Sequence, residues 1–214
     1  MSQLPIDQHL SELTSAVRLG KRAQAVELTN RLLELSVAPS QMLDAMVQAM
    51  DDVGHRFQCQ EIFIPQMLMA SRAMSDAMAL LAPQLSATGV KPRHRALIGT
   101  VAGDVHNIGK DLVAMMWRGA GFDVVDLGTN VPADEFLRAA GERQPDLIGL
   151  SALLTTTMPA VKTTVEALAP VRANGVRVMV GGTPLTQSFA DAIGADGYAP
   201  DAASAVDMAR RLVG

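Results

Sequence analysis

The spacing of apolar residues changes near the middle of the chain. Up to residue 86, apolar side chains recur three or four positions apart, which is typical of helices that bury one face. From residue 94 onward, short and nearly continuous apolar runs alternate with segments that keep the helical spacing. The recurring positions of the first part include Leu10, Leu13, Val17, Met42, Met46, Met50, Met67, Met74, Met78 and Leu81.

The first part is predicted to be entirely helical. Glycine, proline and polar residues interrupt the helical spacing and are expected to end individual helices. Ser40 is a suitable N-cap for a helix that begins near residue 41, because its hydroxyl can accept from a free N–H of the first turn. The pattern predicts about four or five short antiparallel helices packed as a bundle. The interruptions lie at Gly20, residues 38–40, residues 54–61 and residues 82–83.

The second part is predicted to be a parallel sheet. Residues 87–93 replace the helical spacing with glycine, proline and charged residues and are expected to form a linker. Beyond them, apolar strands alternating with helices favour a sheet covered on both faces, in the flavodoxin-like order 2-1-3-4-5. The sequence thus predicts an α/β protein with a helical domain at 1–86 and a Rossmann-type five-stranded domain at 94–214. The predicted strands are 96–102, 122–127, 147–153, 177–180 and 197–199, and the predicted helices are 107–119, 133–143, 157–170, 185–193 and 201–212.

Composition narrows the class of protein. Hydrophobic residues make up 49% of the chain and charged residues 19%, which is enough apolar material for a sizeable core. The net charge of −4 argues against binding nucleic acid through a general basic surface. Cys59 is the sole cysteine, so a disulfide framework and a cysteine-based zinc site are excluded. With no signal-like start and no apolar run long enough to span a bilayer, a soluble cytoplasmic protein without membrane partners is expected.

The stretch from Gly103 to Lys110 combines a histidine, an acid and two glycines between a predicted strand and a predicted helix. Such loops lie at the carboxyl edge of a parallel sheet, where ligands bind. The glycine spacing is one residue too long for a nucleotide phosphate loop, and Asp111 stands where a hydroxyl should hold magnesium. A dinucleotide fingerprint is missing as well, because no G-x-G pair is present.

Asp104 and His106 could form a metal-binding pair. A carboxylate two residues before a histidine can take the Nδ1 proton and leave Nε2 for a metal. A helix-capping Asp and a solvent-exposed His account for the same residues equally well. The other histidines are scattered, which argues against a conventional zinc site with three or four protein ligands. A single protein histidine suits a metal that brings its other ligands in a macrocycle.

Three more groups of residues follow predicted strands of the same sheet. Ser151–Thr157 offers hydroxyls, Gly181–Gly182 permits close approach of a ligand to the backbone, and Tyr198–Asp201 follows the last strand. Each of these could be an ordinary turn or helix cap. Their joint placement at one edge favours a shared site over unrelated turns.

These residues together resemble a known family. The stretch Gly103–Lys110 resembles the Asp-x-His-x-x-Gly signature of cobalamin-binding domains, and Ser151-x-Leu153 and Gly181–Gly182 are similar to the second and third signatures. Residues 126–132 are similar to the segment after the second strand, and residues 53–70 to the helical cap domain that precedes this module in methionine synthase and small corrinoid proteins. Overall the chain resembles the corrinoid protein of methyltransferase systems that demethylate methylamines, methanol, betaines or methoxylated aromatics.

The resemblance implies roles for individual residues. His106 would be the lower axial ligand of cobalt, Asp104 would hydrogen-bond to it, and Thr157 would complete the relay with its hydroxyl. Phe57, Ile64 and Met67 would cover the upper face of the corrin, where Ile64 stands in place of the usual leucine. The residues implied to bind the cofactor in the sheet domain are Asp104, Val105, His106, Asn107, Ile108, Gly109, Ser151, Leu153, Thr155, Gly181, Gly182, Tyr198, Ala199 and Asp201.

The resemblance also implies a function. In a corrinoid methyl carrier, a protein histidine would replace the dimethylbenzimidazole base of cobalamin as a ligand of cobalt. The bound cofactor would cycle between cob(I)alamin and methylcobalamin. Its partners would be a substrate-specific methyltransferase, a second methyltransferase with a tetrahydrofolate or thiol acceptor, and a reductive activase, so the chain would not be a complete enzyme alone. A cobalamin-dependent sensor is an alternative, although no basic DNA-binding segment precedes the module. A mutase subunit is another, but it would not need the helical cap. The sequence leaves the methyl donor and acceptor open.

Overall fold

The computed structural model describes residues 3–87 and 94–214 of the chain. This described part divides into two compact units, an N-terminal and a C-terminal one. The predicted linker lies outside the described residues except for Ala87, so the predicted domain boundaries stay a prediction. The units comprise Met1–Pro92 with Gly119–Gly121, and Arg93–Arg118 with Phe122–Gly214.

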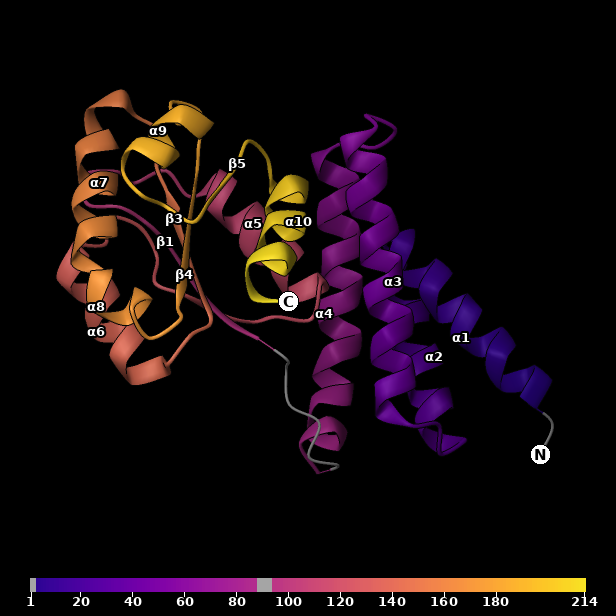
Figure 1. Ribbon diagram of the computed structural model, residues 1–214. Helices are drawn as coiled ribbons and strands as arrows, with labels where there is room; N and C mark the ends of the chain where they lie inside the picture. The colour runs from indigo at the N-terminus through magenta and orange to yellow at the C-terminus, as the bar shows by residue number, and fades with distance from the viewer. Residues whose placement is uncertain (1–2, 88–93) are drawn as a thin grey trace. The chain divides into compact units, whose positions relative to one another are not determined.

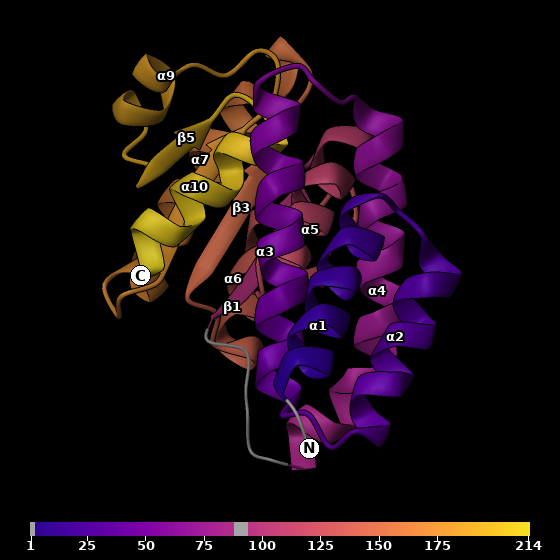
Figure 2. The same cartoon turned by 90° about the vertical axis from the view of Figure 1, so that its right-hand side faces the viewer.

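The N-terminal unit is helical, as the apolar spacing predicts, and its described residues form four helices (Figures 1 and 2). These are α1 (Gln3–Arg18), α2 (Arg22–Glu34), α3 (Pro39–Gln58) and α4 (Ile64–Ala87). Helix α1 packs on α2 and α3, and α4 packs on α2 and α3 as well. Methionine fills much of the interior, where its flexible side chain suits irregular gaps. The buried methionines are Met42, Met46, Met50, Met67 and Met74.

Two of the expected helix boundaries are wrong and one is confirmed. Ser40 does not cap α3, because the helix begins at Pro39, two residues before the expected start, with proline in the first turn, where its missing N–H costs nothing. The interruption expected at residues 54–61 is confirmed, because α3 ends at Gln58 and α4 begins at Ile64, although Gly54 itself is buried inside α3. Pro83 does not end α4, which runs on to Ala87. An interior proline costs roughly 3 kcal/mol, and burial of Leu81 and Leu85 on either side offsets this.

The described residues of the C-terminal unit form a five-stranded parallel sheet in the order β2-β1-β3-β4-β5, which confirms the predicted order. The predicted helix 157–170 is divided, because Pro170 in the first turn of α8 lacks the N–H needed to continue α7. The strands are β1 (Arg95–Thr100), β2 (Asp123–Asp126), β3 (Leu147–Ser151), β4 (Arg177–Gly181) and β5 (Gly197–Ala199). The helices are α5 (Ile108–Gly119), α6 (Ala133–Arg143), the 3-10 turn η1 (Thr155–Thr157), α7 (Met158–Ala167), α8 (Ala169–Arg172), α9 (Gln187–Ala192) and α10 (Ala202–Val213).

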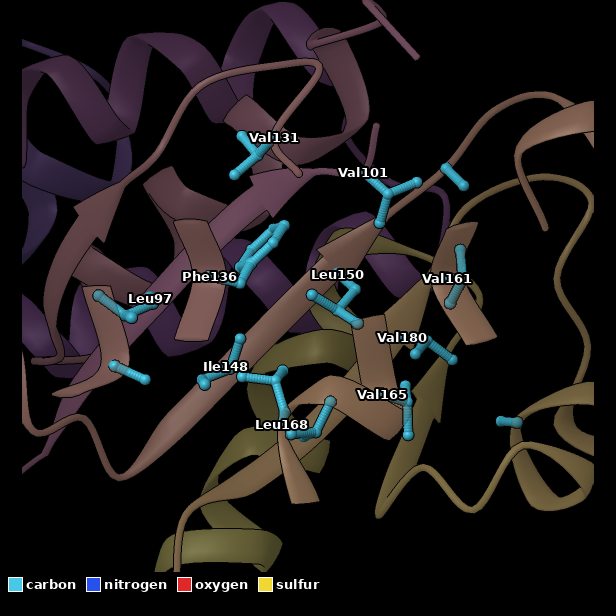
Figure 3. Packing of buried hydrophobic residues seen from close by; sticks show 14 of the residues in the cluster. Leu97, Val101, Val131, Phe136, Ile148, Leu150, Val161, Val165, Leu168 and Val180 are labelled. Carbon is cyan, nitrogen blue, oxygen red and sulfur yellow. The ribbon is translucent and has the colours of Figure 1, made fainter. Parts of the chain in front are cut away.

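Helices cover both faces of this sheet. On one face, strand residues such as Ile148, Leu150 and Val180 pack with Phe136 of α6 and Val161 of α7 (Figure 3). On the other face lie α5 and α10 (Figure 1), joined by the buried Trp117, whose indole Nε1–H donates to the carbonyl of Ala205 at 3.1 Å. Coverage of both faces explains why the strands read as continuous apolar runs. All five strands are parallel, so their carboxyl ends and the loops that follow them meet at one edge.

Candidate functional site

The loop after β1 leaves the sheet abruptly. β1 ends at Thr100, two residues before its predicted end, because Val101 turns away to bridge Val131 in the loop after β2. Gly103 then adopts a positive φ of 83°, which glycine tolerates without steric cost. The Oγ1 hydroxyl of Thr100 donates to the carbonyl of His106 at 2.9 Å and ties the far end of the loop back to the strand. This geometry presents Asp104 inward and His106 outward.

Asp104 is fully buried, and five donors within the described chain surround its carboxylate. Oδ1 accepts from the backbone N–H of His106 at 3.0 Å and pairs with its ring Nδ1 at 2.7 Å. Oδ2 accepts from the N–H of Leu153 at 2.7 Å and of Leu154 at 3.3 Å, and from the Thr157 hydroxyl at 3.1 Å. A buried carboxylate is tolerated only when its oxygens are satisfied in this way.

The electrostatic balance keeps Asp104 ionised. Burial on its own raises the pKa of this carboxyl. Hydrogen bonds from Leu153, His106 and Thr157 together lower the pKa by more than burial raises it, so the pKa lies well below its ordinary value. An ionised carboxylate only accepts hydrogen bonds, so Nδ1 of His106 must carry the proton. In the neutral imidazole Nε2 then keeps its lone pair, and Nε2 has no hydrogen-bond partner in the part of the chain that the structure describes. The imidazole is 47% exposed, so a metal can reach it.

Thr157 lies where the relay implied by the resemblance requires a hydroxyl. The turn η1 carries it, and its Oγ1 lies 3.1 Å from Asp104 Oδ2 and 2.9 Å from the carbonyl of Leu154. A hydroxyl has one proton, so the side chain shares it between these two acceptors or gives it to one of them. The structure thus brings Asp104, His106 and Thr157 together from two loops separated by about 50 positions in the chain.

Two of the signature glycines differ in the space around the position that a Cβ would take. Gly182 has a φ of 132°, and a Cβ there would lie 1.8 Å from the carbonyl oxygen of Ala152, so the fold itself requires glycine. Gly109, in the first turn of α5, is different. Apart from its own helix backbone and chain neighbours, no heavy atom of the described chain lies within 4 Å of the position its Cβ would take. The exposed backbone at Gly109 therefore leaves room for a ligand to approach closely.

An apolar surface surrounds His106. Val105 is 70% exposed, Ile108 is 72% exposed and Leu153 is 42% exposed, and these large apolar side chains follow β1 and β3 at the same edge of the sheet. Exposed apolar side chains that gather beside a polar group indicate a ligand surface. Leu154, which the sequence reasoning missed, is also exposed there and contributes a backbone donor to Asp104. Residue type carries no signal for a backbone N–H, so the pattern could not have found it.

The other predicted residues of the sheet domain lie at the same edge with more ordinary contacts. Ser151 pairs in register with Gly181, and Gly181 pairs with Ala199. Asp201 caps α10, because its Oδ1 accepts from the N–H of Ser204 at 2.8 Å. The remaining predicted positions are Asn107 and Thr155, which are exposed, and Tyr198, which is half-buried. Their part in binding a cofactor stays a prediction.

The predicted cap residues belong to the N-terminal unit. Phe57 is half-buried near the end of α3, and Ile64 is exposed at the start of α4. Met67 is only 1% exposed and packs inside the bundle. Phe63, which was not predicted, exposes 63% of its surface beside Ile64. Their position over a corrin stays a prediction.

Within residues 3–87 and 94–214, no three His, Cys, Asp or Glu side chains gather so that they could hold a metal ion. No helix there combines the length and the apolarity that crossing a bilayer requires.

Comparison with known proteins adds independent findings. Residues 94–207 match a family model described as a B12 binding domain, and residues 10–82 match a second model with the same description. The chain is 39% identical to dimethylamine corrinoid protein 3 of Methanosarcina acetivorans over 97% of this chain and 98% of that protein.

Two solved structures are similar over nearly the whole chain. One is a cobalamin-binding protein from Desulfitobacterium hafniense, at 30% identity and a TM-score of 0.79, with 96% of this chain and 98% of that chain covered. The other is the methanol:cobalamin methyltransferase complex MtaBC from Methanosarcina barkeri. There the identity is 30%, the TM-score is 0.85, and 97% of this chain and 80% of that chain are covered.

Proposed function

Because this chain belongs to the corrinoid proteins with B12-binding domains, we propose that it is a cytoplasmic methyl carrier in which His106 is the lower axial ligand of cobalt. Membership confirms both the resemblance and the cofactor expected from the signature loop. The observation that carries the proposal is the Asp104–His106 pair, in which the carboxylate holds the imidazole proton on Nδ1 and Nε2 is presented at the carboxyl edge of the sheet.

Each residue of the site has a task in this proposal. When bound, cobalamin supplies a cobalt centre that accepts a methyl group from one donor and passes it to another. Asp104 holds the imidazole in one tautomer and orientation, as carboxylates do for metal-bound histidines. Thr157 helps to keep Asp104 ionised by donating to Oδ2.

Apolar side chains have a second task, which is to receive the flat face of the macrocycle. Val105, Ile108 and Leu153 expose such surface beside His106. We propose that Gly109 gives the nucleotide tail its path past α5, because the space at its backbone is open. In the N-terminal unit, Phe57 and Ile64 are the residues we assign to excluding water from the upper face, with Met67 supporting them from the bundle interior.

The proposed partners follow from the task of carrying a group. The solved complex of a methanol:cobalamin methyltransferase includes a chain similar to this one, which supports a substrate-specific methyltransferase as the first partner. The similarity to dimethylamine corrinoid proteins favours a methylated amine as the donor class. A second methyltransferase with a folate or thiol acceptor removes the methyl group. A reductive activase is the third proposed partner.

The test compares two histidines that flank strand β1. His106 follows β1, whereas His94 precedes it at the opposite edge of the sheet, where His94 Nδ1 lies 3.8 Å from Asp146 Oδ2. Wild-type protein, His106→Ala and His94→Ala are loaded with hydroxocobalamin and desalted, and their visible spectra are recorded. We expect a histidine-ligated spectrum from wild type and His94→Ala, and a base-off spectrum without histidine from His106→Ala. Identical spectra from wild type and His106→Ala would refute the ligand assignment.

A further inference from the structure

The loop between β2 and α6 runs alongside the signature loop that follows β1. The backbone N–H of Thr100 donates to the carbonyl of Gly128 at 2.9 Å, and the N–H of Val131 donates to the carbonyl of Thr100 at 2.9 Å. Val101 and Val131 form an isolated parallel bridge. The two loops therefore extend the pairing of β1 and β2 beyond the ends of these strands.

Asn130 holds the signature loop at two successive residues. Its side-chain Oδ1 accepts from the backbone N–H of Gly103 at 2.8 Å, and its own backbone N–H donates to the carbonyl of Asp104 at 2.8 Å. Its φ of 54° lies in the left-handed region, which asparagine tolerates better than most residues. This backbone conformation accompanies the two contacts, one from the side chain and one from the main chain.

These contacts are complementary to those of the Asp104 side chain. The loop after β3 holds the carboxylate through Leu153, Leu154 and Thr157, whereas Asn130 holds the backbone of Asp104 and of the residue before it. Gly103 is exposed and has the wide conformational freedom of glycine, so an anchor at its N–H removes freedom that the loop would otherwise keep. Asp104 in turn orients the ring of His106.

We propose that Asn130 is a positioning residue for His106, because it clamps Gly103 and Asp104 and so fixes the imidazole where it ligates cobalt. The inference rests on the proposed function, since it concerns the orientation of the proposed ligand. Among the described residues, the hydrogen bonds of Asn130 join it to Gly103 and Asp104 and not to the imidazole, and we assign it no contact with the cofactor. Its effect passes through the backbone of the signature loop.

Three variants separate the side-chain contact from the backbone conformation. Asn130→Gly keeps the left-handed backbone and removes the acceptor, whereas Asn130→Asp keeps an acceptor oxygen and also tolerates this backbone. Gln144→Gly is the matched control, because Gln144 has a similar φ of 48° at the end of α6, on another loop of the same sheet domain. Thermal unfolding of each apoprotein verifies that it is folded. Glycine suits a left-handed backbone, so Asn130→Gly should lower Tm only by the loss of its side-chain hydrogen bond to Gly103.

The first readout is hydrogen exchange of residues 101–107 in the apoprotein. We expect Asn130→Gly to speed exchange there by a factor of about two to ten, the range given by the loss of one hydrogen bond. The second readout is the visible spectrum after loading with hydroxocobalamin, where the ratio of histidine-ligated to unligated cobalamin should fall by a similar factor. Asn130→Asp and Gln144→Gly should match wild type in both.

The outcomes distinguish this inference from the proposed function. Wild-type protein without a histidine-ligated spectrum overturns the proposed function, and the positioning role with it. A ligated wild type together with an unchanged ratio in Asn130→Gly overturns the positioning role alone, even if exchange is faster. Loss of ligation in Asn130→Asp as large as in Asn130→Gly also overturns it, because the acceptor oxygen would then be irrelevant.

Discussion

Replacing Gly109 by alanine is expected to stabilise the apoprotein and to weaken its binding of cobalamin. A Cβ at this position meets no heavy atom of the described chain within 4 Å beyond its own helix backbone and chain neighbours. Alanine is favoured over glycine in a helix by about 0.5–1 kcal/mol. That corresponds to a rise in Tm of roughly 1–4 °C for a chain of this size.

The same methyl group lies where we place the path of the nucleotide tail. Forcing an extra carbon into a close-packed contact costs about 1–3 kcal/mol, which weakens binding by a factor of roughly 5 to 150. The two effects of Gly109→Ala thus have opposite signs, and a purely structural role for this glycine does not produce that combination. Thermal unfolding of the apoprotein and a spectroscopic titration with cobalamin measure them separately.

Gly141 provides the matched control for this prediction. It lies inside α6, and a Cβ there also meets nothing within 4 Å among the described residues outside its helix. Gly141→Ala should raise Tm by a similar or larger amount and leave cobalamin affinity unchanged. If Gly109→Ala binds cobalamin as tightly as Gly141→Ala does, the reasoning that assigns the open space at Gly109 to the cofactor is refuted.

Substitutions at three further positions test the site's architecture, each measured as the free energy of unfolding in urea. Asp104→Asn places an amide NH₂ among donors and should cost about 2–4 kcal/mol; wild-type stability would contradict the network of five donors. Thr157→Val should cost about 1 kcal/mol, and Thr157→Ser should restore most of this loss. If Thr157→Val is as stable as wild type, the hydroxyl contributes nothing to stability. Gly182→Ala should cost more than about 3 kcal/mol, since its Cβ would lie 1.8 Å from the carbonyl oxygen of Ala152. A loss of stability well below this value would mean that the backbone can move apart here at little cost.

The sheet was predictable because its signals are strong and local. Strands buried on both faces read as apolar runs, and their alternation with helices permits few arrangements. The predicted helix ends in the bundle failed where tertiary packing outweighed a local signal. Pro83 should end a helix by its chemistry, yet burial of Leu81 and Leu85 continues α4 past it.

The candidate site was predictable only as far as side chains reveal it. Asp104 and His106 stand out because their residue types suit a metal ligand and its hydrogen-bond partner, whereas Thr157 was expected only through the family resemblance. The N–H groups of Leu153 and Leu154 on Asp104 carry no residue signature, and neither does the backbone half of the Asn130 clamp. Whether a glycine serves the fold or a ligand also depends on what surrounds it in space, as the contrast between Gly109 and Gly182 demonstrates.

The crowding of donors around Asp104 has a consequence for how the protein acquires its cofactor. The orientation and tautomer of the imidazole are settled while the chain folds, by contacts that are present before any corrinoid arrives. Preorganised groups lose little freedom on association, so the entropic cost of capture falls on the incoming molecule. Under the proposed binding of cobalamin with His106 in place of its own base, the rate of loading should depend mainly on how fast free cobalamin releases that base, and a corrinoid that lacks this base should load faster than one that carries it.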